Sequence, residues 1–291
     1  MNSAKRKYNE VYMNSIKLLA LDIDGTTMRN NNTLSAKVRQ SIEKAIANGI
    51  IVVVASGRPY GTMPKQILEI EGIDYVIASN GSAVYDKNGK CIRRFLLDEN
   101  EVVKLLGIIE PYDLILEAFI DGLTYTDKRY SDDPIKYGCH EDYVDYVRSA
   151  HGHIEDMKSF ILEHKAELDS IEIIEHNPAV LKMLWDKIEN NTDKFYITSS
   201  TPDFMEFMDK NAGKASALKW LCNELNIDKS SVATCGNADN DADMIEWAGL
   251  GVAVQNAVKS CKQHAQLIVP SNEDDGVAAL IEKIFSPTYK F

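Results

Sequence analysis

Two carboxylates lie two positions apart in the segment Asp22-Ile23-Asp24-Gly25-Thr26, directly after the apolar run 16–21. A buried parallel strand delivers polar groups in this way at its carboxyl end, where doubly wound sheets bind ligands. Two neighbouring carboxylates either bind a cation such as Mg²⁺, which prefers oxygen ligands, or one of them has a raised pKa and stays protonated. Both outcomes suit phosphoryl transfer: Asp22 would attack phosphorus to form an aspartyl phosphate, and Asp24 would protonate the leaving oxygen and later activate water. Alternatively, Asp24 or Thr26 simply caps the next helix.

A second polar cluster, Gly236-Asn237-Ala238-Asp239-Asn240-Asp241, follows the apolar run 232–235. If the two runs are strands of one parallel sheet, the cluster lies at the same edge as Asp22 and could complete a cation site. An Asp-rich turn that caps a helix beginning at Asp241 explains this segment equally well when it is considered alone.

Two further segments could bind a phosphoryl group. The hydroxyl of Ser56 and the backbone amide of Gly57 follow the β-branched run 50–55, so they could donate hydrogen bonds to phosphoryl oxygens at that edge. Lys214 begins a predicted helix directly after Gly213. Taken alone, Ser56 is typical of a turn and Lys214 of a solvated helix start; together with Arg58 they supply the positive charge that the carboxylates need.

Strands alternate with helices on both sides of a central insertion, which predicts an α/β fold with a doubly wound parallel sheet. Asn48 and Gly49 end the first helix in the manner of a C-terminal cap. We predict strands at 16–21, 50–55, 75–78, 232–235, 250–254 and 267–269, and helices at 35–48, 62–71, 214–225, 241–248 and 276–285.

The pattern changes after Asn80 and Gly81. Asp98 and Glu101 resemble a capping box, and Asp121-Gly122 lies between two apolar runs as in a hairpin, which does not belong in a parallel sheet. Beyond a Tyr- and Asp-rich stretch of ambiguous structure we expect helices at 155–168 and 178–189 and strands at 170–175 and 195–198. The predicted organisation is a leader of residues 1–14, a core of residues 15–83 and 194–291, and an inserted mixed domain of residues 84–193.

Composition narrows the function classes. The chain has 291 residues, enough for two domains, and its 32 basic and 44 acidic side chains give a net charge of −12, which disfavours nucleic acid and anionic membranes as partners. Five cysteines without a CxxC pair are typical of a reducing compartment, so we expect a cytoplasmic protein. No apolar run approaches the ~20 residues that span a bilayer.

Two further groups of residues are weaker candidates. His151 and His153 could bind a transition metal, but no other ligand has a recognisable spacing, so a solvated loop is favoured. Several tyrosines of the insertion could pack against sugar carbons, although half-buried packing is the default for this residue type. They are Tyr125, Tyr130, Tyr137, Tyr143 and Tyr146.

The ordered motifs resemble those of the haloacid dehalogenase superfamily of phosphotransferases. The resemblance rests on Asp22-Ile-Asp-Gly-Thr, Ser56, Lys214 and Gly236-Asn-Ala-Asp-Asn-Asp, and spans about residues 16–285. The large insertion between the second and third motifs is similar to the mixed α/β cap, of the C2 or IIB type, in Cof-type phosphatases. The resemblance implies a Rossmann-like core, Mg²⁺ as cofactor and a cap that sets substrate specificity.

The resemblance also implies a role for each matching residue. Asp22 resembles the nucleophile and a Mg²⁺ ligand, and Asp24 resembles the general acid and base that binds the metal through its carbonyl. Ser56 resembles the phosphate-binding hydroxyl, with Gly57 beside it. Lys214 resembles the cation that steadies nucleophile and phosphate, and the Asn240–Asp241 pair resembles the residues that complete the phosphate and metal shells.

One position departs from the family pattern. The family usually has Asp directly after the glycine of the fourth motif, where this chain has Asn237. An amide oxygen can still coordinate Mg²⁺, but the site loses one negative charge and should hold the ion more weakly. We expect Asp241, helped by Asp239, to maintain enough charge.

The sequence therefore predicts a Mg²⁺-dependent phosphatase that acts on a small phosphorylated metabolite, with sugar phosphates as the class that the resemblance implies. Two alternatives stay open. A hexose phosphomutase of the same architecture would return the phosphoryl group to sugar, and a phosphosugar-binding regulator would have lost catalysis through Asn237. The sequence names neither the individual substrate nor the oligomeric state.

Overall fold

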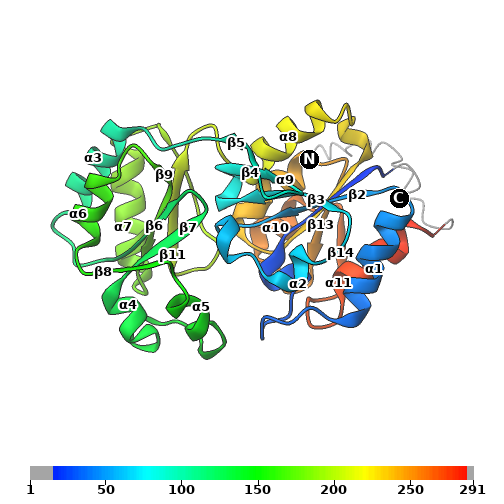
Figure 1. Cartoon of the computed structure of the whole chain (residues 1–291), viewed down its shortest axis with the longest axis horizontal. Helices are drawn as coiled ribbons and strands as arrows, with labels where there is room; N and C mark the ends of the chain where they lie inside the picture. The colour runs from blue at the N-terminus through cyan, green and yellow to red at the C-terminus, as the bar shows by residue number, and fades with distance from the viewer. Residues whose placement is uncertain (1–15, 287–291) are drawn as a thin grey trace, which may run out of the picture.

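The computed structural model describes residues 16–286, so the predicted leader of residues 1–14 lies outside the described residues. The chain forms two lobes, each built around one β-sheet (Figure 1). We call the lobe with the eight-stranded sheet the core lobe and the lobe with the six-stranded sheet the cap lobe. Within residues 16–286 no helix is long and apolar enough to cross a membrane.

The core sheet is parallel except at one edge. Its central strands are short runs of aliphatic residues buried on both faces, as expected where helices cover both sides. Its strand order is β14-β13-β12-β1-β2-β3-β4-β5, in which β4 runs antiparallel to both of its neighbours, β3 and β5. The strands are β1 (Leu18–Leu21), β2 (Ile51–Ala55), β3 (Ile73–Ala78), β4 (Ala83–Asp86), β5 (Cys91–Arg94), β12 (Val232–Gly236), β13 (Leu250–Val254) and β14 (Leu267–Val269).

Helices α1 (Ala36–Ala47) and α11 (Gly276–Ile284) pack on one face of this sheet, and α8 (Lys214–Glu224) and α9 (Ala242–Trp247) pack on the other (Figure 1). The short helix α10 (Lys259–His264) lies beside α9. This arrangement confirms the doubly wound α/β core. It also brings the carboxyl ends of β12, β1, β2 and β3 to one edge of the sheet.

The predicted helix at 62–71 is wrong in length, because only one α-turn forms there. Helix α2 (Lys65–Leu68) is preceded by an extended Met63 and Pro64. Proline disfavours the helical region for the residue before it, so Pro64 separates the short turn at Tyr60–Thr62 from α2.

The cap sheet has the order β10-β11-β9-β6-β7-β8 and is antiparallel except for the β7–β8 pair. Its strands are β6 (Ile115–Ile120), β7 (Leu123–Asp127), β8 (Gly152–Ile154), β9 (Leu168–Ile174), β10 (Phe195–Thr198) and β11 (Phe204–Asp209). Three helices cover one face: α3 (Glu99–Ile109), α6 (Met157–Glu163) and α7 (Pro178–Glu189). The ambiguous Tyr-rich stretch forms short helices, among them α4 (Lys128–Asp132) and α5 (Val144–Arg148).

The predicted boundaries of the inserted domain are wrong by one hairpin at each end. Strands β4 and β5 lie almost wholly in the range predicted as insertion, but they extend the core sheet. Strands β10 and β11 lie in the range predicted as core, but β11 pairs with the cap strand β9 and β10 pairs with β11. Hydrophobic periodicity identifies a strand but does not reveal its partner, which is set by contacts distant in sequence. The predicted helix at 155–168 is also too long, because α6 ends at Glu163 and β9 already begins at Leu168.

Candidate active site

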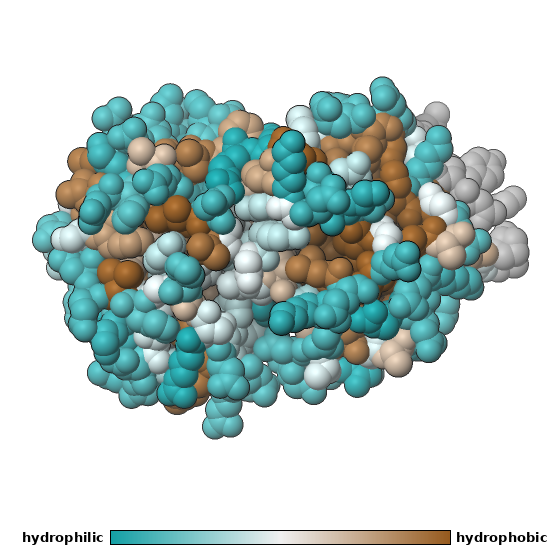
Figure 2. Space-filling model, viewed as in Figure 1, coloured by the Kyte–Doolittle hydropathy of each residue, from teal (hydrophilic) through white to brown (hydrophobic). Residues whose placement is uncertain are grey.

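A pocket of about 290 Å³ lies between the two lobes and is lined by residues of both sheets. From the core lobe it receives the polar residues that follow β1, β2 and β12. From the cap lobe it receives side chains of β6, β9 and β11 and tyrosines of the α4–α5 region. On the face shown in Figure 2 the lobes meet at a narrower waist, where residues of intermediate hydropathy gather. We refer to this space as the interlobe pocket.

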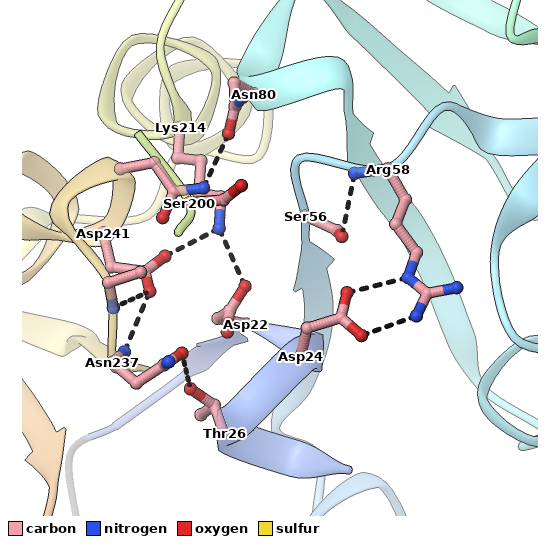
Figure 3. Close-up of polar contacts among 12 residues, drawn as sticks. Asp22, Asp24, Thr26, Ser56, Arg58, Asn80, Ser200, Lys214, Asn237 and Asp241 are labelled. Carbon is pink, nitrogen blue, oxygen red and sulfur yellow. Dashed lines mark hydrogen bonds and ion pairs between the residues drawn. The ribbon is translucent and has the colours of Figure 1, made fainter. Parts of the chain in front are cut away.

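Asp22 and Lys214 form the buried centre of the core side of the site (Figure 3). The Nζ atom of Lys214 donates to Asp22 Oδ1 at 2.8 Å and to Asp241 Oδ1 at 2.7 Å. Burial raises the pKa of Asp22 to about 7, and the carboxylate of Asp241 adds to this effect against the opposing ammonium of Lys214. Burial by itself lowers the pKa of Lys214, but the two carboxylates outweigh it and hold this pKa above its ordinary value. The lysine therefore stays charged.

The carboxylate of Asp241 accepts hydrogen bonds from three groups and in turn positions the loop after β12. Besides Lys214, the main-chain N–H groups of Asn237 and Ala238 donate to its Oδ2 atom at 2.9 and 3.1 Å. Both carboxylate oxygens of Asp241 are thus engaged. Its role as a magnesium ligand stays a prediction, and in this structure its contacts are those of a group that orients Lys214 and the loop.

Asp24 also lines the interlobe pocket, but its partner differs from that of Asp22. Arg58 binds its carboxylate through two bonds, from Nε at 2.7 Å and from Nη2 at 2.6 Å (Figure 3). The guanidinium also stacks on the ring of Tyr146 in the cap lobe, 4.4 Å from its centroid. The side chain of Arg58 is largely buried between the lobes.

The end of the Asn237 side chain meets a cradle of oxygen atoms. Thr26 Oγ1 lies 2.8 Å from Oδ1 of this amide in the orientation drawn in Figure 3. With the amide turned over, its nitrogen donates to Thr26 Oγ1, to the carbonyl oxygen of Asp24 and to Asp22 Oδ2 at 2.8, 2.8 and 2.9 Å. A carboxylate oxygen and a carbonyl oxygen therefore converge on one point beside Asn237.

This cradle fits Mg²⁺ in the type of its donors, because the ion prefers carboxylate and carbonyl oxygens and keeps several waters. Asp22, the carbonyl of Asp24 and the amide oxygen of Asn237 are the atoms that would hold it. Within the described part of the chain no three His, Cys, Asp or Glu side chains are grouped as a metal site. This set of donors contains one carboxylate side chain, that of Asp22, whereas the sequence motifs predicted the carboxylate of Asp241 as a ligand as well.

The predicted phosphate-binding residues surround the same space. Ser56 is buried at the end of β2, and both it and Gly57 line the interlobe pocket, with the Ser56 Oγ accepting from the N–H of Arg58 at 3.1 Å. Asn240 lines the pocket as well, but its amide nitrogen donates to Asn80 Oδ1 at 2.9 Å. Asn240 thus begins a chain of amide contacts.

Asn80 and Glu206 are site residues that the motifs did not assign. Asn80 follows β3 with a φ of 50° and donates to a carboxylate oxygen of Glu206 on β11. The fourth motif is thereby connected through Asn240 and Asn80 to the cap sheet. No sequence pattern marked Glu206, the partner of Asn80 in the cap lobe.

The cap lobe contributes aromatic side chains from four of the five predicted tyrosines. Those that line the interlobe pocket are Tyr130, Tyr137, Tyr143 and Tyr146. Tyr125 instead packs against Phe160 and His151. Four tyrosine rings against the pocket can pack on the carbon atoms of a ligand, such as the ring carbons of a sugar.

Comparisons with known proteins agree with this geometry. The family model of haloacid dehalogenase-like hydrolases matches residues 19–281. YxeH of Bacillus subtilis (strain 168) is 30% identical over 282 residues, which cover 92% of this chain and 98% of that protein. The 5-amino-6-(5-phospho-D-ribitylamino)uracil phosphatase YwtE of the same organism is 26% identical, covering 94% of this chain and 100% of its own.

A solved haloacid dehalogenase-like hydrolase from B. subtilis superimposes with a TM-score of 0.79 at 25% identity, over 92% of this chain and 99% of the other. The ordered motifs, the core and cap lobes and these relatives lead to one assignment. The chain belongs to the haloacid dehalogenase-like hydrolases and is a phosphatase of their Cof type.

Proposed function

We propose that this phosphatase hydrolyses small phosphorylated metabolites, sugar phosphates above all, with Mg²⁺ as cofactor and through an aspartyl phosphate on Asp22. The observation that carries the proposal is the contact of Lys214 Nζ with Asp22 Oδ1 at 2.8 Å beside the interlobe pocket. Such a contact orients one reactive carboxylate and places positive charge where the phosphoryl group must arrive.

The reaction runs in two displacements. A carboxylate oxygen of Asp22 attacks phosphorus while the bond to the leaving oxygen breaks, and Asp24 gives that oxygen a proton. Water then attacks the aspartyl phosphate and Asp24 takes its proton, which frees orthophosphate and restores Asp22. In this structure Arg58 binds both oxygens of Asp24, so Asp24 must release one of these bonds before that oxygen carries the proton to the leaving group.

Magnesium, when bound at the oxygen cradle, neutralises charge on the phosphoryl oxygens. The ammonium of Lys214, which contacts the other oxygen of Asp22, also neutralises charge on the phosphoryl oxygens. Asp241 keeps this lysine in place. Ser56 and the amide of Gly57 supply donors for the remaining phosphoryl oxygens.

The pocket limits the size of the substrate. A space of about 290 Å³ enclosed between two lobes suits a small metabolite and excludes a folded phosphoprotein. Four tyrosine rings along the cap side support a sugar or a similarly hydroxylated chain as the leaving group. Five free thiols among the cysteines support the reducing cytoplasm as the place of action.

Release of orthophosphate from a panel of phosphorylated metabolites, with and without magnesium, tests the proposal. We expect turnover of sugar phosphates that requires magnesium and that Asp22→Asn abolishes. Asp193→Asn, a change at an exposed carboxylate outside the pocket, is the matched control and should leave turnover unchanged. Turnover that survives in Asp22→Asn contradicts the proposed nucleophile.

The panel also separates the two alternatives. A phosphomutase would require a sugar bisphosphate and return the phosphoryl group to sugar. A phosphosugar-binding regulator would be stabilised against heat by a ligand and release no phosphate from any ester. The regulator has one observation in its favour, because the Asn237 amide can itself satisfy the oxygens of the cradle.

A further inference from the structure

Three glutamates form a row across the face of the cap sheet that lines the interlobe pocket. Glu117 on β6 lies opposite Glu172 on β9, and Glu172 lies opposite Glu206 on β11. Residues alternate between the two faces of a strand, and the neighbours Leu116 and Ala118 pack into the apolar core beneath α3, α6 and α7. All three carboxyl groups line the pocket. We call them the Glu row.

The Glu row is costly for the folded protein. Its members are 7%, 5% and 2% exposed, and like charges directly opposite each other on neighbouring strands repel. Burial raises the pKa of Glu117 to about 7; burial, reinforced by Glu206 and Glu117, raises the pKa of Glu172 well above its ordinary value. Apolar side chains at these positions would fold with less strain, so the row points to a ligand.

The basic side chains that line the pocket contact other carboxylates. Arg58 binds Asp24, His140 lies 3.2 Å from Asp142, and His176 lies 3.1 Å from Asp203. Among the residues that the structure describes, no lysine, arginine or histidine forms an ion pair with the Glu row. No cationic side chain of the described residues therefore balances the charge of the row when its carboxyl groups are ionised.

The uncompensated part of the row is its Glu117–Glu172 end. Glu206 already accepts hydrogen bonds from the side chain of Asn80 and from the N–H of Ser200 at 2.6 Å. By contrast, Oε1 of Glu172 is buried without a hydrogen-bond partner in residues 16–286. A buried acceptor without a donor is rare in folded proteins and marks the place where a ligand donor fits.

We propose that the Glu row binds a protonated amine on the leaving group, so that aminated phosphate esters, such as amino sugar phosphates, are preferred over their hydroxyl analogues. This inference rests on the proposed phosphatase function. An ammonium brings three donors and a positive charge between Glu117 and Glu172, whereas a hydroxyl brings a donor without charge. The ammonium would also separate the Glu row from the phosphate dianion, which we propose the core lobe binds.

Matched pairs of substrates test this proposal. Initial rates are measured for glucosamine 6-phosphate against glucose 6-phosphate, and for pairs of phosphorylated amino alcohols and diols that differ in the distance from nitrogen to phosphate. We expect at least one amine to exceed its hydroxyl partner by roughly tenfold or more in kcat/KM, since a charge-assisted hydrogen bond is worth about 1.5–3 kcal/mol. Acetylation of that amine should remove the advantage.

Two isosteric variants assign the preference to the row. Glu172→Gln and Glu117→Gln keep the shape of the side chain and remove its charge, so the amine-to-hydroxyl ratio of kcat/KM should fall toward one. Glu189→Gln, at an exposed position near the end of α7, is the matched control and should keep the wild-type ratio. Thermal unfolding of each variant verifies that it is folded.

The outcomes distinguish this inference from the function on which it rests. If the wild type hydrolyses p-nitrophenyl phosphate and neutral sugar phosphates but no amine exceeds its hydroxyl partner, the inference is overturned and the phosphatase stands. A preference for amines that persists in both glutamine variants also overturns it. If no ester, including p-nitrophenyl phosphate, releases orthophosphate, the proposed function itself fails.

Discussion

At the scale of single residues, the ammonium of Lys214 stabilises two buried carboxylates at once. Its side chain has no exposed surface and contacts both Asp22 and Asp241. Lys214→Met leaves both carboxylates without their cation, and the loss of one partner from a buried ion pair costs about 3–5 kcal/mol. We therefore expect a fall of this size in the free energy of unfolding, measured with urea.

The matched control is Lys219→Met on the same helix, where the side chain is exposed. It should change stability by less than about 0.5 kcal/mol. Equal stability of the two variants would mean that Lys214 does not balance the charge of the site.

Asn237 occupies the position at which the sequence resemblance leads us to expect an aspartate. The amide end contacts Asp22 Oδ2 and the Asp24 carbonyl, so Asn237→Asp adds a carboxylate at the oxygen cradle. An additional anionic ligand should strengthen magnesium binding by roughly tenfold or more. Calorimetric titration of the substrate-free protein with magnesium measures this. Unchanged affinity would remove position 237 from the ligand set.

At the scale of elements, the start of helix α8 depends on the turn that follows β3. Gly81 has a φ of +90°, and a Cβ atom placed there would lie 2.3 Å from the carbonyl oxygen of Gly213, directly before Lys214. Gly81→Ala should lower the free energy of unfolding by about 2–4 kcal/mol and reduce kcat by displacing Lys214.

Gly107 gives the comparison for this substitution. It lies in α3, where an added Cβ meets nothing within 4 Å. Gly107→Ala should raise stability by about 0.5–1 kcal/mol, because alanine loses less backbone entropy in a helix. Urea unfolding measures the free energy of unfolding of both variants. A lower stability of Gly107→Ala, or an unchanged stability of Gly81→Ala, would contradict the claim that the surroundings of each glycine decide the effect of an added Cβ atom.

The elements of the core were predictable because local signals agree with long-range packing. Gly49 has a φ of +84° after α1, as the sequence predicted, and the strands of the parallel sheet were recognised as buried aliphatic runs. Partner choice was not predictable: β10 and β11 have ordinary strand patterns, and they join the cap because β11 pairs with β9 and β10 pairs with β11. The helix predicted at 62–71 is shorter in the structure because Pro64 disfavours helical backbone at Met63, so α2 begins only at Lys65.

The core half of the site followed from the sequence for the same reason, because Asp22, Ser56 and Asn237 each come directly after a strand of one parallel sheet. The cap half did not. Glu117, Glu172 and Glu206 are scattered along the chain and become neighbours through antiparallel register, which no local motif encodes. The contact of Arg58 with the cap residue Tyr146 was likewise not predictable, because the two residues are distant in sequence.

At the scale of the whole molecule, the Glu row makes stability depend on pH. The pKa of Glu117 rises from an ordinary 4.5 to about 7 on folding. Protonation of the Glu117 carboxyl therefore favours the folded protein over the unfolded chain. This contribution is complete below about pH 4.5 and is lost as the pH rises through 7, a loss on the order of 3 kcal/mol. Glu172, with its raised pKa, acts in the same direction.

The variant Glu117→Gln isolates this contribution. Its stability relative to the wild type should increase between pH 4.5 and 7 and then level off, measured by urea unfolding at each pH. A difference that stays constant over this range would show that Glu117 has an ordinary pKa in the folded protein.

The central claim is that Asp22 carries the phosphoryl group during turnover. Acid quenching during steady-state hydrolysis of a good substrate, followed by proteolysis and mass spectrometry, locates any covalent phosphoryl group. We predict that the group is found on the peptide that contains Asp22 and is absent from Asp22→Asn. Active wild-type enzyme that shows no phosphoryl adduct under these conditions, or an adduct on another residue, would contradict the account.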